Sequence, residues 1–397
     1  MSQPPLARRV QDLHPTAVNR VLAEVRALQA TGRTAVSLMR GEPDLPTPPH
    51  IVEAAERALR NGRTSYPDNR GELALREAVA VKLHRDNQLS YDPASEILIT
   101  TGATFGVYAA LMALLNPGDE VLLPDPIYDA YASPIRLTGG VPVRVPCPPR
   151  HQRFELSADT IEEQLTPRTR ALLLNTPWNP TGTVFRADEL RAIARVVVER
   201  NLWLISDEIY EAITYGDARH FSPVAAVPEL RPRTVLVNAL SKTYSMTGWR
   251  VGYCAAPEAV TRAMLLVLQQ SSRGPATFVQ DAAAEALRGP QEAVARMRDE
   301  YAARRAAVLE GMADAPGCRM MEPEGGFFAM ADIRALETPS DEIRRKLLEE
   351  HGLVVIHGAA YGACGEGTLR VSFASGGETL REGLRRLRLG LEAIAGT

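Results

Sequence analysis

Short, largely apolar runs recur through the middle of the chain, and each is followed by a polar segment and then by a stretch with helical periodicity. Runs of this kind occupy residues 96–100, 120–123, 171–174, 202–205 and 235–237. A wholly apolar run such as 171–174 is typical of a strand that is buried on both faces of a parallel sheet. The alternation of such strands with helices predicts an α/β domain.

The two ends of the chain show other patterns. Residues 16–30 predict an amphipathic helix that ends near Gly32, and a short strand is expected at 36–39. A long charged helix, expected at about 291–313, has the length of a connector between domains. Beyond it, the pattern predicts a smaller α+β unit with strands near 327–330, 353–356 and 369–373 and helices at 340–350 and 378–395. Because the chain has 397 residues and domains mostly run about 100–200 residues, two domains are expected.

Composition narrows the classes of function. The chain is 45% hydrophobic and 23% charged, with a formal net charge of −3, so it offers no electrostatic case for binding nucleic acid or an anionic membrane. Its four cysteines are far apart and lack metal-ligand spacing, which predicts reduced thiols and no metal site. The N-terminal segment has no apolar signal core, and no run of about 18 apolar residues occurs, so a soluble cytoplasmic protein is expected.

The strand at 235–237 leads to candidate chemistry. It delivers Ser241 and Lys242 to the carboxyl end of a buried parallel strand, where open α/β sheets bind ligands. Arg250 lies eight residues later, and its planar guanidinium suits a bidentate grip on a phosphate. A lysine that can form an imine, together with such an arginine, indicates pyridoxal 5'-phosphate (PLP), which needs a Schiff-base lysine. For the Ser-Lys pair alone, a solvated surface lysine is the simpler interpretation.

Other strands end in further candidate residues. Small residues at 102–104 open a helix and predict either an anion site or an ordinary tight turn. Tyr128 is suited to stacking on a planar cofactor, and a rigid loop presents Asn179. Asp207 ends a buried strand, where an acid is costly unless it is paired, although it also suits a helix N-cap. Tyr210 follows three residues after Asp207. All these side chains are expected at the same edge of one sheet, and packing alone does not explain that joint placement. The absence of a GxGxxG loop argues against a nicotinamide dehydrogenase.

Together these residues resemble the class I aminotransferases, the aspartate aminotransferase-like PLP enzymes of fold type I. The matching segments occur in the expected order and span nearly the whole chain: GEPD at 41–44, NPTG at 179–182, DEIY at 207–210, SKTYSMTGWRVG at 241–252 and RVSFA at 370–374. The resemblance implies an α/β fold whose large domain, residues 47–295, surrounds a mostly parallel seven-stranded sheet. Residues 1–46 and 296–397 would form a small α+β domain from both chain ends. It also implies a homodimer in which each active site lies at the subunit interface.

The resemblance implies a role for each residue around the cofactor ring. Lys242 would form the Schiff base with PLP and then act as base and acid in the 1,3-proton shift. Asp207 would pair with the protonated pyridine nitrogen, while Tyr210 and Asn179 would hydrogen-bond the ring hydroxyl oxygen. Tyr128 would stack on the ring. Lys242, Asp207 and Tyr210 form the implied catalytic set.

The remaining implied contacts hold the phosphate and the substrate. Arg250 would bind the phosphate, with Tyr66 reaching it from the other subunit. Arg370 would grip the substrate α-carboxylate as a bidentate pair, and the N–H of Gly41 would lie near the same carboxylate. The implied sets are Gly102, Ala103, Thr104, Tyr128, Asn179, Asp207, Tyr210, Lys242, Arg250 and Tyr66 for the cofactor, and Gly41, Tyr128, Asn179 and Arg370 for the substrate.

Several positions depart from the family pattern or carry a separate expectation. Ala239 stands where a serine or glycine is usual, so one phosphate contact is missing or is supplied by Ser241. Trp178 is expected to shape the pocket beside Asn179. His357 replaces the proline of a Pro-Gly turn and is better interpreted as a turn histidine than as a site residue. Cis peptide bonds are expected at Asn179-Pro180 and Asp125-Pro126.

The predicted reaction is ping-pong transamination between an L-amino acid and a 2-oxo acid. Some dicarboxylate-specific relatives place a lysine just after the glycine turn, where this chain has Thr104 and Phe105, which weakens an aspartate-only assignment. Phe105, Trp178 and Phe327 predict an apolar pocket for neutral or aromatic side chains, or a broad preference. Arg273 is either a partner for a distal carboxylate, across the dimer, or a solvated loop residue.

Two other functions share this fold. The residues that hold the cofactor do not separate an aminotransferase from a lyase or decarboxylase, so that alternative stays open. A PLP-sensing regulator with a DNA-binding domain is disfavoured, because the expected fold begins by residue 16 and the charge does not suit DNA.

Overall fold

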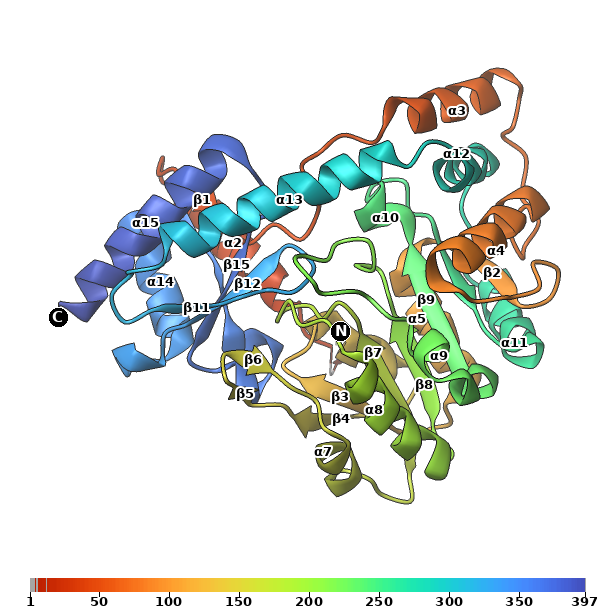
Figure 1. The fold of residues 1–397 in the computed structure, drawn as a ribbon, viewed down its shortest axis with the longest axis horizontal. Coiled ribbons are helices and arrows are strands. Elements are labelled where there is room, and N and C mark those ends of the chain that lie inside the picture. The colour runs from red at the N-terminus through yellow and green to blue at the C-terminus, as the bar shows by residue number, and fades with distance from the viewer. Residues whose placement is uncertain (1–3, 5, 12, 397) are drawn as a thin grey trace.

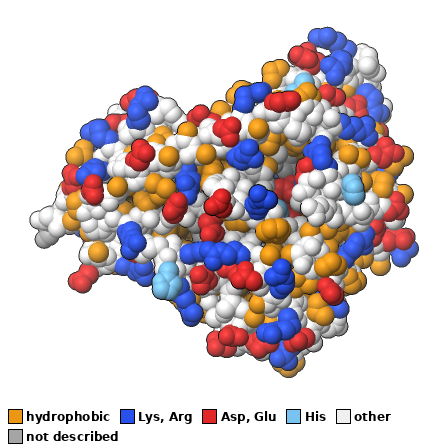
Figure 2. Space-filling view, viewed as in Figure 1, with side chains coloured by type: hydrophobic (Ala, Val, Ile, Leu, Met, Phe, Trp, Pro, Cys, Tyr) orange, Lys and Arg blue, Asp and Glu red, His pale blue; other side chains and the backbone are white. Residues whose placement is uncertain are grey.

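The computed structural model describes residues 4, 6–11 and 13–396, and Figure 1 shows two lobes. The larger lobe surrounds a seven-stranded sheet, while the smaller lobe contains the C-terminal part of the chain together with helix α2 (Ala17–Ala30) and strand β1 (Val36–Ser37). Helix α13 (Glu292–Gly311) runs from one lobe to the other, as the connector expected at 291–313 should. On the face seen in Figure 2, acidic and basic side chains are interspersed, in keeping with the net charge of −3.

The sheet of the large lobe has the strand order β2-β10-β9-β8-β7-β3-β4. Its strands are β2 (Ile97–Thr100), β3 (Glu120–Asp125), β4 (Val141–Pro146), β7 (Thr169–Asn175), β8 (Trp203–Asp207), β9 (Thr234–Ala239) and β10 (Gly252–Ala255). Strand β10 runs antiparallel to both of its neighbours, whereas β4, β3, β7, β8 and β9 pair in parallel. The prediction of a mostly parallel seven-stranded sheet is confirmed.

Helices pack around this sheet and bury its apolar strands. Leu173, Ile205 and Val237, which lie in three neighbouring central strands, are completely buried in one hydrophobic core. The helix that follows β2, α5 (Gly102–Leu114), packs on β8, β9 and β10. The other helices of the lobe are α3 (Pro49–Arg60), α4 (Leu73–Asn87), α6 (Ala132–Leu137), α7 (Ala158–Glu163), α8 (Ala187–Glu199), α9 (Pro223–Ala226), α10 (Leu240–Thr243), α11 (Glu258–Gln269) and α12 (Thr277–Arg288).

The small lobe joins both ends of the chain. It contains a four-stranded antiparallel sheet of order β11-β12-β15-β14 and a parallel pair of β1 with β13. The remaining elements are α14 (Ser340–His351), α15 (Gly377–Ala395), β11 (Arg319–Met321), β12 (Phe328–Asp332), β13 (Leu353–Val354), β14 (Ile356–His357) and β15 (Thr368–Ser372). A second core contains Tyr301 of α13 and Phe327. The boundaries at 46/47 and 295/296 stay predictions.

Some strands differ from the sequence-based expectations. The strand expected at 36–39 is assigned only over Val36–Ser37, although the N–H of Leu38 still donates to Val354 O at 2.9 Å. The strand expected at 353–356 is split into two. Its first part, β13, pairs with β1, and its second part, β14, pairs with β15 in the other sheet. The edge strand β11 and the hairpin β5 (Pro149–Arg150) with β6 (Arg153–Phe154) were not expected, since neither has an apolar run. Across the described part of the chain, every helix is too short or too polar to traverse a lipid bilayer.

Candidate active site

A cavity of about 970 Å³ lies where the strands of the large lobe end and the small lobe approaches them. Both lobes contribute to its lining, which includes most of the residues that the sequence singled out. The predicted residues that line it are Gly41, Ala103, Thr104, Tyr128, Asn179, Asp207, Tyr210, Lys242, Arg250 and Arg370. Residues separated by more than 300 positions in the sequence therefore meet in one cavity.

Lys242 projects into this cavity from α10, the short helix that follows β9 directly. Its Nζ donates a hydrogen bond of 2.6 Å to the carbonyl oxygen of Gly41, so the amine of the large lobe touches the segment that leads out of β1. Burial lowers the pKa of Lys242 to about 8. A lysine with a lowered pKa has more of the neutral amine that can act as a nucleophile near neutral pH.

Asp207 ends β8 and is 5% exposed. Its Oδ2 accepts a hydrogen bond of 2.6 Å from the Tyr131 hydroxyl, and its Oδ1 accepts one of 3.1 Å from the N–H of Ile209. Burial raises the pKa of Asp207 to about 6, against the effect of these two hydrogen bonds, which favour the ionised form. Sequence analysis missed Tyr131; its position three residues after Tyr128, on the same side of a helical turn, was the available signal.

The residues around Asp207 are fixed by backbone and side-chain contacts. The N–H of Asn179 donates to Asn175 Oδ1 at 2.8 Å, and the N–H of Tyr128 donates to the carbonyl oxygen of Asn179 at 3.1 Å. Tyr210 is buried and meets the ring of Phe328 edge-on, at 6.0 Å between centroids. Its burial raises the pKa of its hydroxyl, which therefore stays protonated at neutral pH.

A small cradle lies at the start of α5. Gly102 has φ of +78°, and a Cβ atom built there would lie 2.7 Å from Nη2 of Arg250. Among the described residues, no side chain caps the start of α5, so the N–H groups of its first turn are available to an anion. The Arg250 guanidinium lies beside this turn. Ser241 lines the same cavity, whereas Ala239 is buried in β9 and brings no hydroxyl.

Arg370, on β15, is 2% exposed and is held on several sides. Its Nη1 donates to Asn179 Oδ1 at 3.3 Å and its Nη2 donates to Met39 O at 2.9 Å. Its guanidinium carbon lies 4.2 Å from the ring centroid of Phe328 and 5.0 Å from that of Tyr361. Within the described part of the chain, the Nε atom of Arg370 is buried and has no hydrogen-bond partner.

Tyr66 and Arg273 do not line the cavity of their own chain. Tyr66 is 86% exposed, and the guanidinium of Arg273 lies 5.9 Å from its ring centroid. Both residues are therefore on the surface of the large lobe, and their predicted roles across a dimer stay predictions.

The predicted apolar lining needs correction. Phe105, Trp178 and Phe327 do not line the cavity. Trp178 is buried and stacks on Phe185, with 5.6 Å between ring centroids, while Phe327 lies in the core of the small lobe. Phe328 lines the cavity instead of Phe327, because successive residues of a strand point to opposite faces.

Two smaller expectations can be compared with the structure. His357 lies outside the cavity lining and contacts Asp341 Oδ1 through Nδ1 at 3.4 Å, which agrees with its interpretation as a turn histidine. The bonds Asp125-Pro126 and Asn179-Pro180 are cis, as expected; Thr176-Pro177 is also cis and was not predicted.

Sequence analysis also missed the part played by α2. Thr16, Val18, Asn19 and Leu22, from the N-cap and first turns of this helix, line the cavity, as does Arg40. The amphipathic pattern predicted the helix but gave no information about the lobe surface on which it packs.

Comparison with known proteins agrees with this geometry. The family described as aminotransferase class I and II matches residues 33–387 of the chain. A probable aspartate/prephenate aminotransferase of Aquifex aeolicus is 41% identical, over 98% of this chain and 99% of that protein. An aromatic-amino-acid aminotransferase of Thermococcus litoralis is 38% identical, over 96% of this chain and 97% of that protein. The solved structure of an aspartate aminotransferase from Thermus thermophilus with maleate has a TM-score of 0.91 and 38% identity, and covers 98% of this chain and 100% of that one.

The similarity extends over almost the full length of each of these proteins, at well over 30% identity, and the fold agrees with that of a solved relative. The chain therefore belongs to the class I and II aminotransferase family and is an aminotransferase.

Proposed function

We propose that the cavity binds PLP, and that the chain moves the amino group of an L-amino acid to a 2-oxo acid by ping-pong transamination, with Lys242 as the residue that carries the cofactor. One observation carries the proposal: the sequence has three lysines, and Lys242 is the one that lines the cavity, together with Asp207 and Arg370. Lys82 is buried in a pair with Glu211, and Lys346 pairs with Glu342 on the surface.

The side chains of the cavity fit PLP at both of its ends. The open first turn of α5 and the adjacent Arg250 suit a phosphate, and the space left by Gly102 lets the guanidinium approach the turn closely. The carboxylate of Asp207 suits the pyridine nitrogen, because a buried acid is stabilised by a cationic partner.

When bound, PLP supplies an electron sink for the electrons released at the substrate Cα. In its neutral form Lys242 takes the Cα proton and later returns it, and its lowered pKa of about 8 makes that form accessible near neutral pH. Asp207, ionised above its pKa of about 6, would hold the positive charge on the pyridine nitrogen. Tyr210 and Asn179 would hydrogen-bond the ring hydroxyl oxygen, and Tyr128 would stack on the ring.

Arg370 and Gly41 orient the substrate. The guanidinium of Arg370 gives the α-carboxylate a bidentate partner whose plane is already fixed by Phe328 and Tyr361. Gly41 also lines the cavity, and its N–H would donate to the same carboxylate. Residues at the start of helix α2 form part of the wall of the same cavity.

The proposed side-chain preference is for neutral or aromatic amino acids, or a broad range. The cationic residues in the described lining are Arg40, Lys242, Arg250 and Arg370. The last three have the roles given above, and Arg40 is paired with Glu42 at 3.3 Å. Among the described lining residues, each cation therefore already has a partner or a proposed role, and none is left for a distal carboxylate. Relatives named for aspartate/prephenate and for aromatic amino acids are compatible with this range.

The proposed active unit is a homodimer in which each chain completes the site of the other. Tyr66 supports this proposal, because it is 86% exposed and does not line the cavity of its own chain. A residue that reaches into the site of a partner subunit would have such a position. A mass measurement in solution tests the assembly, and a monomer with full activity would rule it out.

The test of the function uses one half-reaction at a time. Single L-amino acids are added to PLP-loaded protein without any 2-oxo acid, while the visible spectrum and the products are followed. Loss of the visible cofactor band with release of one 2-oxo acid per site is expected, and the fastest donors reveal the side-chain preference. Release of carbon dioxide, ammonia or a thiol, with the band regained, would instead support a lyase or decarboxylase.

A further inference from the structure

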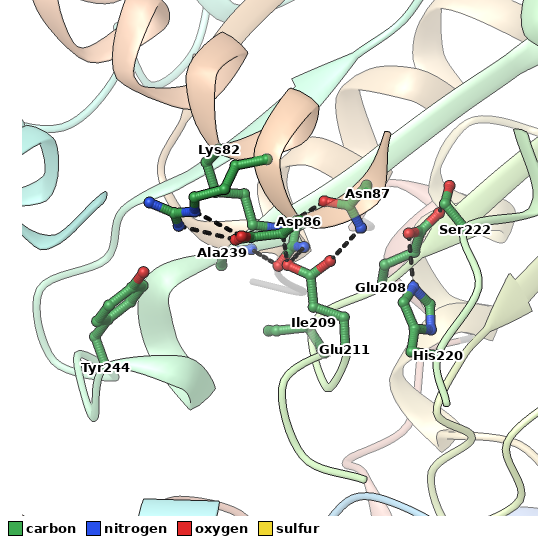
Figure 3. Close-up of polar contacts among 12 residues, drawn as sticks. Lys82, Asp86, Asn87, Glu208, Ile209, Glu211, His220, Ser222, Ala239 and Tyr244 are labelled. Carbon is green, nitrogen blue, oxygen red and sulfur yellow. Dashed lines mark hydrogen bonds and ion pairs between the residues drawn. The ribbon is translucent and has the colours of Figure 1, made fainter. Parts of the chain in front are cut away.

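The turn after β8 carries polar side chains on two sides. Asp207 and Tyr210 line the cavity, whereas Glu208 and Glu211 do not. Figure 3 shows Glu208 and Glu211 among polar partners from other elements: Lys82 and Asn87 near Glu211, and His220 and Ser222 near Glu208. The two residues with proposed roles at the cofactor and the two glutamates therefore alternate along one short turn.

The carboxylate of Glu211 has three polar partners, which are Lys82, Asn87 and Asn238. Its Oε1 pairs with Lys82 Nζ and accepts a hydrogen bond of 2.7 Å from Asn238 Nδ2. Its Oε2 accepts one of 2.7 Å from Asn87 Nδ2, and Lys82 Nζ also donates to Asn87 Oδ1 at 2.8 Å. All the carboxylate contacts come from outside the turn, so Glu211 ties the turn to α4 and to β9.

The pair of Lys82 and Glu211 is deeply buried, with side-chain exposures of 7% and 9%. Burial favours the neutral acid, yet Lys82 and His220 hold the pKa of Glu211 below its usual range, so the carboxylate is ionised. Removal of one member of such a pair leaves the other charge buried without its partner, which is strongly destabilising. Glu208, Glu211 and His220 bring ligand atoms within 4.8 Å of one another, but Lys82 already neutralises Glu211, and we assign no metal to them.

The partners of Glu211 connect two strand tips. Glu211 follows Tyr210 directly and stands four residues after Asp207, while Asn238 stands four residues before Lys242. The same tips are joined by a backbone hydrogen bond of 2.9 Å from the N–H of Glu208 to Val237 O. The distance between the Asp207–Tyr210 turn and Lys242 is thus set partly by the hydrogen bond between Glu211 and Asn238, neither of which lines the cavity.

We infer that Glu211, held by Lys82, Asn87 and Asn238, is a positioning residue that fixes the Asp207–Tyr210 turn relative to Lys242 and so sets the geometry in which the cofactor is held. This inference rests on the proposed function, because it assigns a purpose to the spacing of residues with proposed roles at PLP. It concerns a residue that touches neither cofactor nor substrate.

The test compares Glu211→Gln with a matched control, Glu120→Gln. The Glu120 side chain is also buried, with 4% exposure, and it bonds Arg168 at 2.7 Å, although Arg168 itself is exposed. Glu120 lies at the start of β3, at the end of the sheet away from the cavity. Three quantities are measured: the melting temperature, the Kd of the apo-protein for PLP, and the pH at which the visible band of the PLP-loaded protein changes.

Both variants are expected to lower the melting temperature. Only Glu211→Gln is expected to raise the Kd for PLP, by about tenfold, because the interaction energy between residues in direct contact commonly corresponds to such a factor. Only this variant is also expected to change the pH midpoint of the visible band. If Glu211→Gln does not fold, Asn87→Ala provides the test. It keeps the ion pair of Lys82 and Glu211 and removes the Asn87 hydrogen bonds to Glu211 Oε2 and to Lys82 Nζ. A weakening of PLP binding by about threefold is then expected.

Wild-type values of Kd and pH midpoint in both Glu211→Gln and Asn87→Ala would overturn the inference and leave the proposed function intact. Equal changes in the Glu120→Gln control would overturn it as well, because they would mark a general loss of stability. A wild-type protein that binds no PLP would contradict the proposed function and this inference with it.

Discussion

The carboxylate of Asp129 accepts a hydrogen bond of 2.6 Å from the backbone N–H of Ala17. Asp129 follows Tyr128 in the large lobe, and Ala17 is the first residue of α2 in the small lobe. A carboxylate at a helix N-terminus satisfies a free N–H group and interacts favourably with the helix dipole. The bond therefore attaches α2, whose first turns line the cavity, to the loop that carries Tyr128, the proposed stacking residue.

Replacement of Asp129 by alanine should loosen this attachment. We expect KM for the amino acid to rise severalfold with a smaller change in kcat, and the free energy of unfolding to fall by about 1 kcal/mol, the usual effect of losing a helix cap. Steady-state kinetics and thermal unfolding measure both. Asp129→Asn keeps a hydrogen-bond acceptor without the charge, so its KM and stability should lie between those of the wild type and of Asp129→Ala. A wild-type KM in Asp129→Ala would show that other contacts hold α2 in place.

The hydrogen bond from Tyr131 to Asp207 should set the acidic limit of cofactor binding. Asp207 must be ionised to hold the pyridine nitrogen, so PLP binding should weaken as the pH falls through its pKa of about 6. Tyr131→Phe removes a bond that favours the ionised form, and we expect this limit to move upward by about one pH unit. The Kd for PLP measured from pH 5 to 8 in both proteins checks this, and identical profiles would contradict it.

The attachment of PLP to the apo-protein should depend on the neutral form of Lys242. Because its pKa is lowered by burial to about 8, the second-order rate should rise about tenfold per pH unit below that value and level off above it. Stopped-flow absorbance with free PLP follows the rate. A rate that is still rising at pH 10, as for a solvated lysine, would show that burial does not tune this amine.

Arg370→Lys should mainly weaken amino-acid binding, because an ammonium lacks the planar fork that meets both carboxylate oxygens. We expect KM to rise by about tenfold or more, since a charged hydrogen bond in a buried site is lost. PLP binding serves as the control and should change little. Equal affinity for every amino acid would remove Arg370 from the substrate site.

The sequence was most informative where chemistry coincides with the ends of parallel strands. Asp207 ends β8 and Lys242 follows β9, so their meeting at one edge of the sheet was predictable from the strand pattern alone. Phe327 was assigned to the cavity and Phe328 was not, because the alternation of a strand fixes which residues share a face but not which face meets the cavity.

Other contacts depend on how separate helices pack, and no local signal contains them. Ala17 meets Asp129 across 112 positions, and Lys82 meets Glu211 across 129. Each of these pairs joins a helix to a turn that is far away in the sequence. The order of the motifs identified the family, but the contacts that hold the site in place became visible only in the structure.

The most direct test of the central claim is to find which lysine carries PLP. The PLP-loaded protein is treated with borohydride, digested and analysed by mass spectrometry, with Lys242→Ala processed in parallel. A pyridoxyl group on the peptide that contains Lys242, and no visible cofactor band and no turnover in the variant, is the predicted result. Because the sequence has only two other lysines, Lys82 and Lys346, a group on either of them, or retained turnover in Lys242→Ala, would contradict the account.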